Sequence, residues 1–148
     1  MYREQLLHRK FLELGTTEKK SILLVDDEPN FRASAAFLLT QLGYCINEAG
    51  DASEALRLIL DCQQKDDQFH LLITDMKLPA MSGMTLLKHV RTAGITFPVL
   101  IITGYLDLLV FKELQRMEPL DILIKPFKPD ELLERIALLT SVEQTLMT

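Results

Sequence analysis

Short apolar runs alternate with longer segments of helical period along most of the chain. Runs rich in Val, Ile and Leu favour strands, and apolar positions three or four residues apart favour helices. We expect strands near 22–25, 44–48, 69–74, 98–102 and 121–124. We expect helices near 29–42, 52–65, 84–93, 106–117 and 129–146. Five strand–helix pairs in this order predict an α/β fold in which a parallel sheet carries helices on both faces.

The runs ILLV, LLI, VLII and ILI are apolar at every position. Strands of a parallel sheet that are covered on both faces have this continuous pattern, so we expect all four to be covered on both sides. The second strand, in YCINEA, is more polar, which predicts an edge position.

Residues with distinctive backbone preferences mark several helix ends. Pro29 suits the first turn of a helix, where its missing N–H has no partner in any case. Gly43 suits the left-handed residue that ends the same helix. Asp51 and Glu54 have the spacing of a capping box, and Ser82 suits the cap of the following helix.

The first 20 residues stand outside the alternation. Their apolar side chains share one helical face, and residues 15–20 have the composition of a linker. This helix either packs on the domain or serves as an interaction helix, and about two heptads are too few to decide. We expect an extension and linker at 1–20, one domain at 21–142 and a tail at 143–148.

Length and composition fit one globular domain, since the chain has 148 residues, of which 48% are hydrophobic and 25% charged. A net charge of −5 without a long Lys/Arg run argues against direct contact with nucleic acid. The apolar runs are too short to span a membrane, and the first ten residues lack the core of a signal peptide, so we expect a cytoplasmic protein. Cys45 and Cys62 fit no metal or redox spacing, and we expect reduced thiols that fill core space.

Polar side chains follow four of the predicted strands where each strand ends. Asp26 and Asp27 follow the first strand, Asp75 the third, Thr103 the fourth and Lys125 the fifth. The carboxyl ends of parallel strands share one edge, where open α/β sheets bind ligands. Each residue alone is more often a cap, a turn residue or a solvated charge. The combination of these residues predicts a ligand-binding site at this edge of the sheet.

The chemistry of this set points to phosphoryl transfer. Three carboxylates held close together repel one another unless a divalent cation joins them, and Mg²⁺ (or Mn²⁺) takes such ligands together with phosphate oxygens. Lys125 and Thr103 add a cation and a hydroxyl for a phosphoryl group. Aspartate can accept that group as an acyl phosphate. Asp26 and Asp27 suit the metal as a pair, so Asp75 is the expected acceptor.

Together these motifs resemble the receiver domain of two-component response regulators. The motifs are ILLVDDEP at 22–29, LLITDMKLPAMSGM at 71–84, IITG at 101–104 and ILIKPF at 122–127, within a resemblance that covers about 21–139. The resemblance implies a flavodoxin-like, doubly wound sheet of five strands in the order 2-1-3-4-5. It also implies a sensor histidine kinase or phosphotransfer protein as partner. Such a domain catalyses only its own phosphorylation and dephosphorylation, so we do not expect an enzyme in the ordinary sense.

The resemblance further implies roles for single positions. Asp75 would accept the phosphoryl group, and Mg²⁺ would bind Asp75, Asp27 and the backbone carbonyl of Lys77. Asp26 would act mainly through metal-bound water. Lys77 and Tyr105 flank the phosphate site, and we expect them to influence the lifetime of the acyl phosphate. The alternative is that both side chains are simply solvated.

The switch implied by the resemblance departs from the usual pattern at one position. Thr103 would hold the phosphoryl group and move on activation, and Lys125 would pair with the phosphoryl oxygens and form a cis bond to Pro126. Many receivers carry Tyr or Phe where this chain has Ile122. We therefore predict ordinary phosphorylation but a different readout. The excess of apolar residues in the helix near 106–117 predicts a phosphorylation-linked interface over 106–139, used in homodimer formation or signalling.

Two other interpretations stay open. Phosphatases of the haloacid dehalogenase type share the Asp nucleophile, but they need a second Asp where this chain has Lys77. A pseudo-receiver, which binds partners without being phosphorylated, is kept open by Ile122. No helix-turn-helix or catalytic domain is expected in the chain, and the sequence does not decide whether it is a piece of a longer protein.

Overall fold

The computed structural model describes residues 19–147, with side chains as far as Ser141. All ten expected elements are present: β1 (Ser21–Val25), α2 (Pro29–Gln41), β2 (Cys45–Ala49), α3 (Ala52–Gln64), β3 (Leu71–Asp75), α4 (Gly83–Thr92), β4 (Val99–Thr103), α5 (Leu108–Gln115), β5 (Leu120–Ile124) and α6 (Pro129–Met147). The predicted tail is, as far as Met147, the end of α6. The predicted helix before residue 19 lies outside the described residues.

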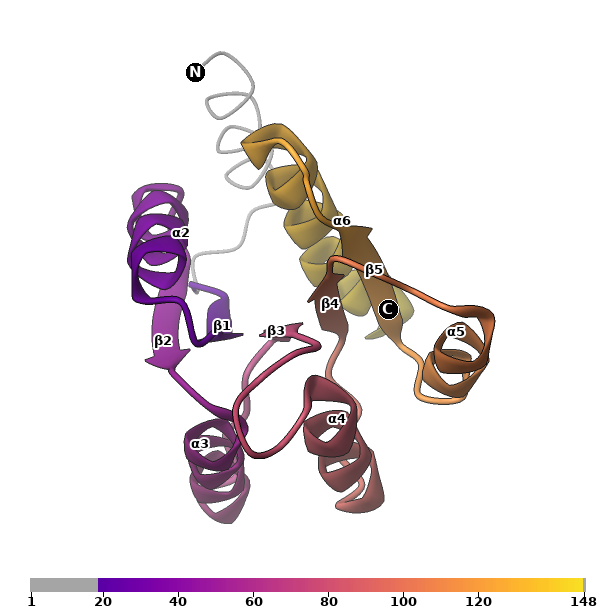
Figure 1. Ribbon diagram of the computed structural model, residues 1–148. Coiled ribbons are helices and arrows are strands. Elements are labelled where there is room, and N and C mark those ends of the chain that lie inside the picture. Colours follow the sequence, from indigo (N-terminus) through magenta and orange to yellow (C-terminus); the bar gives the residue numbers. More distant parts are fainter. Residues whose placement is uncertain (1–18, 148) are drawn as a thin grey trace.

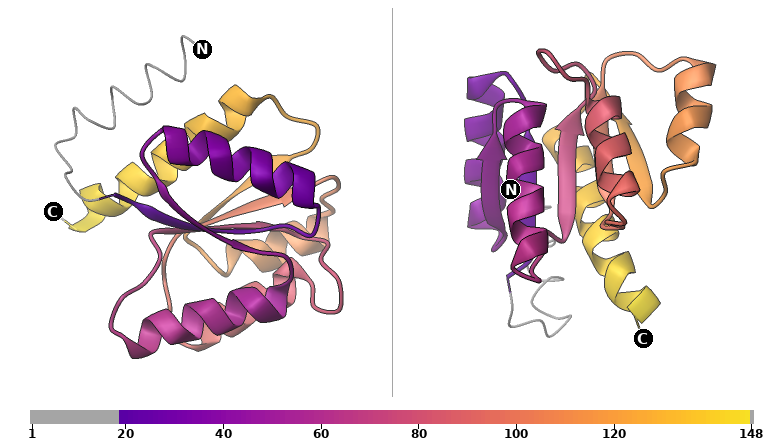
Figure 2. Two further views of the ribbon diagram at one scale, coloured as in Figure 1. Left: turned by 90° about the vertical axis from the view of Figure 1, so that its left-hand side faces the viewer. Right: turned by 90° about the horizontal axis from the view of Figure 1, so that it is seen from below.

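The five strands form one parallel sheet in the order β2-β1-β3-β4-β5, which confirms the expected topology. Helices α2 and α6 cover one face, and α3, α4 and α5 lie on the other side (Figures 1 and 2). Each face has its own hydrophobic cluster against the sheet. β3 is the central strand and is buried at all five positions, and the polar β2 lies at an edge as predicted.

The expectation that the strand of the ILI run is covered on both sides is wrong. β5 is the second edge strand, and its last residue, Ile124, is 51% exposed. Helix α5 stands out beside β5 rather than over it (Figure 1). A run of three apolar residues has the same pattern in a central strand and in a half-covered edge strand, so periodicity alone could not distinguish the two.

The predicted helix ends are confirmed. Pro29 occupies the first turn of α2, and Gly43 has a φ of 98° after it. Asp51 caps α3 by accepting from the N–H of Glu54 at 2.8 Å, and Ser82 caps α4. The two cysteines are free thiols. Cys62 is half-buried and packs against the core cluster, whereas Cys45 is exposed on the edge strand β2, so the expectation that it fills core space is wrong.

Side chains of α4 bind both α5 and the segment that follows it. Leu114 is the one fully buried residue of α5. Lys88 of α4 forms an ion pair with Glu113 at 2.5 Å. Arg91 of α4 donates to the carbonyls of Ile95, Met117 and Pro119, each at 2.9 Å, and so holds the segment between α5 and β5. No helix within the described part of the chain is both long enough and apolar enough to cross a membrane.

Candidate functional site

Three carboxylates meet at the carboxyl edge of the sheet. One oxygen from each of Asp26, Asp27 and Asp75 lies within 4.8 Å of the others. β1 and β3 are neighbours in the sheet, so the residues that end them are brought together by strand pairing. Asp26 and Asp75 are buried, whereas Asp27 is exposed to solvent.

Asp75 is held on both of its oxygens. Nζ of Lys125 lies 2.7 Å from Oδ2, and the backbone N–H of Lys77 donates to Oδ1 at 3.1 Å. The backbone N–H of Lys125 donates to the carbonyl of Thr103 at 2.8 Å, which extends the pairing of β4 and β5 up to the site. The Lys125 side chain therefore reaches across the end of β4 to the central strand.

The electrostatics of the cluster favour a bound cation. Burial raises the pKa of Asp26 above its ordinary value, and the charges of Asp75 and Asp27 act in the same direction. The N–H of Glu28, 2.8 Å from Oδ1 of Asp26, and the ammonium of Lys125 act in the opposite direction. Because three carboxylates face one ammonium, the cluster still carries excess negative charge, and these oxygen ligands suit a hard divalent cation such as Mg²⁺.

Thr103 reaches the same edge, but its hydroxyl is already engaged. The residue is 3% exposed, and Oγ1 donates to the carbonyl of Tyr105 at 2.8 Å while accepting from the Tyr105 N–H at 3.3 Å. The hydroxyl therefore holds the turn after β4 in this structure. The side chains of Lys77 and Tyr105 are exposed beside the site.

The model of the response regulator receiver domain family matches residues 22–137. The chain belongs to this family. It is 31% identical over 116 residues to the transcriptional regulatory protein FixJ of Rhizobium meliloti, which covers 78% of this chain and 54% of FixJ. It is 33% identical over 124 residues to DltR of Streptococcus agalactiae, covering 80% of this chain and 51% of DltR. The chain thus spans about half the length of the curated relatives it matches.

Solved receiver structures have the same fold. The receiver domain of the Francisella response regulator 1452 superposes with a TM-score of 0.73 at 26% identity, covering 84% of this chain and 99% of that one. The chemotaxis protein CheY4 of Vibrio cholerae gives a TM-score of 0.72 at 27% identity, with 82% and 99% covered. These likenesses, together with the sheet order, confirm the flavodoxin-like fold expected for a receiver.

Ile122, to which the sequence assigned a switch role, lies in β5 and is half-buried against the cluster on the α5 side of the sheet. Its carbonyl accepts from Arg135 of α6 at 3.2 Å, and Arg135 also pairs with Asp121 at 2.8 Å. The expected cis bond between Lys125 and Pro126 is present. Ile122 therefore packs in the same cluster as Val110 and Leu114 of α5.

Gly83 is a site residue to which the sequence reasoning assigned no role. A Cβ at this position would lie 2.3 Å from the backbone oxygen of Asp75 and 3.1 Å from Cα of Met76. The N–H of Gly83 donates to the carbonyl of Met76 at 2.9 Å. The loop after the acceptor strand thus returns directly against the strand end. A Gly between the predicted cap Ser82 and the predicted helix at 84–93, where an ordinary side chain fits unless another backbone comes close, was the available signal.

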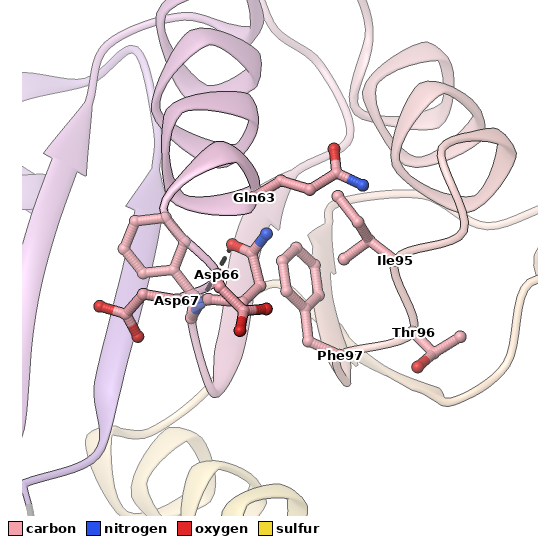
Figure 3. A pocket seen from close by; sticks show the side chains of 8 residues that line it. Gln63, Asp66, Asp67, Ile95, Thr96 and Phe97 are labelled. Atoms are coloured by element: carbon pink, nitrogen blue, oxygen red, sulfur yellow. Dashed lines mark hydrogen bonds between the residues drawn. The ribbon is translucent and has the colours of Figure 1, made fainter.

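A hollow lies at the opposite, amino edge of the sheet. Gln63, Asp66 and Asp67 line it at the end of α3, and Ile95 and Phe97 line it before β4 (Figure 3). None of the predicted site residues lines this hollow. The candidate site is therefore the carboxylate cluster at the carboxyl edge, away from this hollow.

Proposed function

We infer that this receiver accepts a phosphoryl group on Asp75 in a Mg²⁺-dependent reaction, from a sensor histidine kinase or a phosphotransfer protein. The observation that carries the proposal is the position of the Asp75 carboxylate between the ammonium of Lys125 and the carboxylates of Asp26 and Asp27. A lone carboxylate at a strand end is explained by a turn or cap role, whereas one between a cation and a metal-binding pair is also placed for nucleophilic attack on phosphorus.

The transfer forms one bond and breaks one. A carboxylate oxygen of Asp75 attacks the phosphorus, the P–N bond to the donor histidine breaks, and its electron pair stays with the imidazole. Mg²⁺, held by Asp27, Asp75 and the Lys77 carbonyl, with Asp26 acting mainly through metal-bound water, would neutralise the charge of the carboxylates and the phosphoryl oxygens. The chain provides the acceptor and this electrostatic support and turns over no separate substrate, so we propose that it catalyses only its own phosphorylation and dephosphorylation.

The conformational response is proposed to begin at Thr103. A phosphoryl oxygen is a stronger acceptor than a carbonyl, so the hydroxyl would exchange the carbonyl of Tyr105 for the phosphoryl group. That exchange releases the turn that leads into α5. Ile122, half-buried beside α5, would take up the space without the hydroxyl of an aromatic switch.

The output proposed for this response is association with a second copy of the chain through the 106–139 face. The first turn of α5 presents Leu108 and Leu109, the latter 79% exposed, and Ile124 is exposed on the neighbouring strand. Sedimentation velocity with and without beryllofluoride and Mg²⁺ tests this, with association expected in the parent and loss of it in Leu109→Asp. A parent that stays monomeric under both conditions would overturn the dimer proposal.

The acceptor proposal is tested by intact-mass spectrometry after incubation with acetyl phosphate and Mg²⁺. The parent is expected to gain the mass of one phosphoryl group, and Asp75→Asn is expected to gain none. EDTA should also prevent the gain. A parent of unchanged mass would mean a pseudo-receiver, and turnover of small phosphate esters would mean a phosphatase.

A further inference from the structure

Arg32, in the first turn of α2, connects the ends of two strands beside the carboxylate cluster. Its Nη1 donates to the backbone oxygen of Asp26 at 2.6 Å, and its Nε lies 3.3 Å from Oε1 of Glu48 at the end of β2. Only 23% of the Arg32 side chain is exposed. A planar guanidinium that engages two acceptors at once is restricted in orientation in a way that a flexible ammonium cannot reproduce.

With the bond from Arg32, the backbone of Asp26 is hydrogen-bonded at both its N–H and its carbonyl. The Asp26 N–H donates to the carbonyl of Ala49 at 3.2 Å, and the carbonyl accepts from Arg32. That carbonyl belongs to the peptide group that joins Asp26 to Asp27. The orientation of this peptide plane therefore depends on Arg32.

Asp27 depends on that backbone for its position. Asp26 accepts a hydrogen bond from Glu28, and Asp75 accepts bonds from Lys77 and Lys125. Within the described part of the chain, the Asp27 carboxylate accepts no hydrogen bond. It is the one member of the cluster that is placed by its main chain alone.

The surroundings of Arg32 fit a geometric role. Its charge is paired with Glu48 rather than with the cluster. A Cβ at Gly50 would lie 3.3 Å from Nη1, so the glycine leaves room for the guanidinium. Glu48 thus holds Arg32 over the Asp26 carbonyl, and Gly50, just after β2, leaves space for it.

We propose that Arg32 is a positioning residue for the metal half of the site, fixing the peptide from which the Asp27 carboxylate projects toward Mg²⁺. The inference rests on the proposed function. Groups that orient metal ligands typically change metal affinity by 10–100-fold when they are removed, and we expect the Mg²⁺ dissociation constant of Arg32→Ala to rise by about tenfold.

Isothermal titration with Mg²⁺ tests this in the parent, Arg32→Ala, Arg32→Lys and the control Arg57→Ala. Arg57 lies on α3, is 64% exposed and, among the residues that the structure describes, pairs only with Asp61 at 4.0 Å, so its removal should leave Mg²⁺ affinity unchanged. Lysine keeps the charge but not the two-point hold, and Arg32→Lys should recover only part of the affinity. Labelling by acetyl phosphate, measured against Mg²⁺ concentration, is the second readout.

The two readouts separate positioning from general structural damage. Positioning raises the half-saturating Mg²⁺ concentration of Arg32→Ala, while labelling at saturating Mg²⁺ returns to the parent rate. Lower labelling at every Mg²⁺ concentration, an unchanged dissociation constant, or full recovery by lysine would each overturn the role. If the parent itself neither binds Mg²⁺ nor is labelled, the proposed function fails and this inference fails with it.

Discussion

Nζ of Lys125 lies 2.7 Å from Oδ2 of Asp75, although 50 residues separate the two in the chain. The Lys125 side chain is 42% exposed, so the free energy of this ion pair is about 1 kcal/mol at most. The ion pair matters instead for placement, because it holds the Lys125 ammonium against the Asp75 carboxylate on the side opposite Asp26 and Asp27.

Lys125→Ala is therefore expected to affect chemistry more than stability. The free energy of unfolding should change by less than about 1 kcal/mol, because the pair is partly solvated. Labelling by acetyl phosphate should be strongly slowed, because the phosphoryl oxygens lose their cation. Urea unfolding and intact-mass time courses measure the two effects, with the exposed Lys112→Ala as control. Equal labelling rates in both variants would contradict the role of Lys125.

Asp26→Asn is expected to stabilise the protein at neutral pH in the absence of Mg²⁺. Burial raises the folded-state pKa of Asp26 above its ordinary value of 3.8, so its charge costs stability at pH above the raised folded value. The cost disappears as pH falls to the unfolded value, and parent and variant should converge below about pH 4. Asparagine can still accept the bond from Glu28. Urea unfolding across this range measures the difference, and a variant less stable at neutral pH would refute the reasoning.

Added Mg²⁺ should make the parent more stable than Asp26→Asn. The metal stabilises the folded parent by about 2.7 kcal/mol at a hundred times its dissociation constant, and it stabilises a variant with weaker binding by less. The same unfolding experiment with added Mg²⁺ provides the control.

Gly83→Ala is expected to destabilise the domain by about 1–3 kcal/mol, because the new methyl group overlaps the backbone oxygen of Asp75. Gly104→Ala is a matched control, since no atom lies within 4 Å of its Cβ position, and its effect should be within about 0.5 kcal/mol. Because the overlap shifts the acceptor strand end, Gly83→Ala should also label more slowly. Equal stability of the two variants would mean that the loop after β3 adapts freely.

Thr103→Ala and Thr103→Ser separate the hydroxyl from the methyl group. Alanine removes the bond to the Tyr105 carbonyl and should cost about 1 kcal/mol of stability, whereas serine retains it. Both variants keep Asp75 and should be labelled. Only the serine variant should show the beryllofluoride-induced NMR shifts of α5, and full shifts in the alanine variant would remove Thr103 from the switch.

Lys77→Ala is expected to shorten the lifetime of the acyl phosphate, because the side chain is exposed beside Asp75 and a methyl group leaves water freer access. The decay of phosphorylated protein after removal of acetyl phosphate measures this, with Lys112→Ala as the surface control. An unchanged half-life would mean that Lys77 is simply solvated.

The hydrophobic pattern was sufficient for the element order, because each strand and helix is specified by signals within a few residues of it. It was also sufficient to bring Asp26, Asp27, Asp75, Thr103 and Lys125 to one edge, since parallel strands end on the same side. The pattern predicted β5 as a strand but not its edge position, because central and edge strands of three apolar residues have the same pattern.

The sequence by itself determined the fold class, the strand ends that carry chemistry, and the types of group gathered there. Only the tertiary structure decided how those groups are held: Thr103 on the turn after β4, Gly83 against the acceptor backbone, and Arg32 between two strand ends. The physical reason is range. Periodicity and capping act over a few residues, whereas a hydrogen bond or a close backbone approach depends on which distant segments the folded chain brings within about 3 Å.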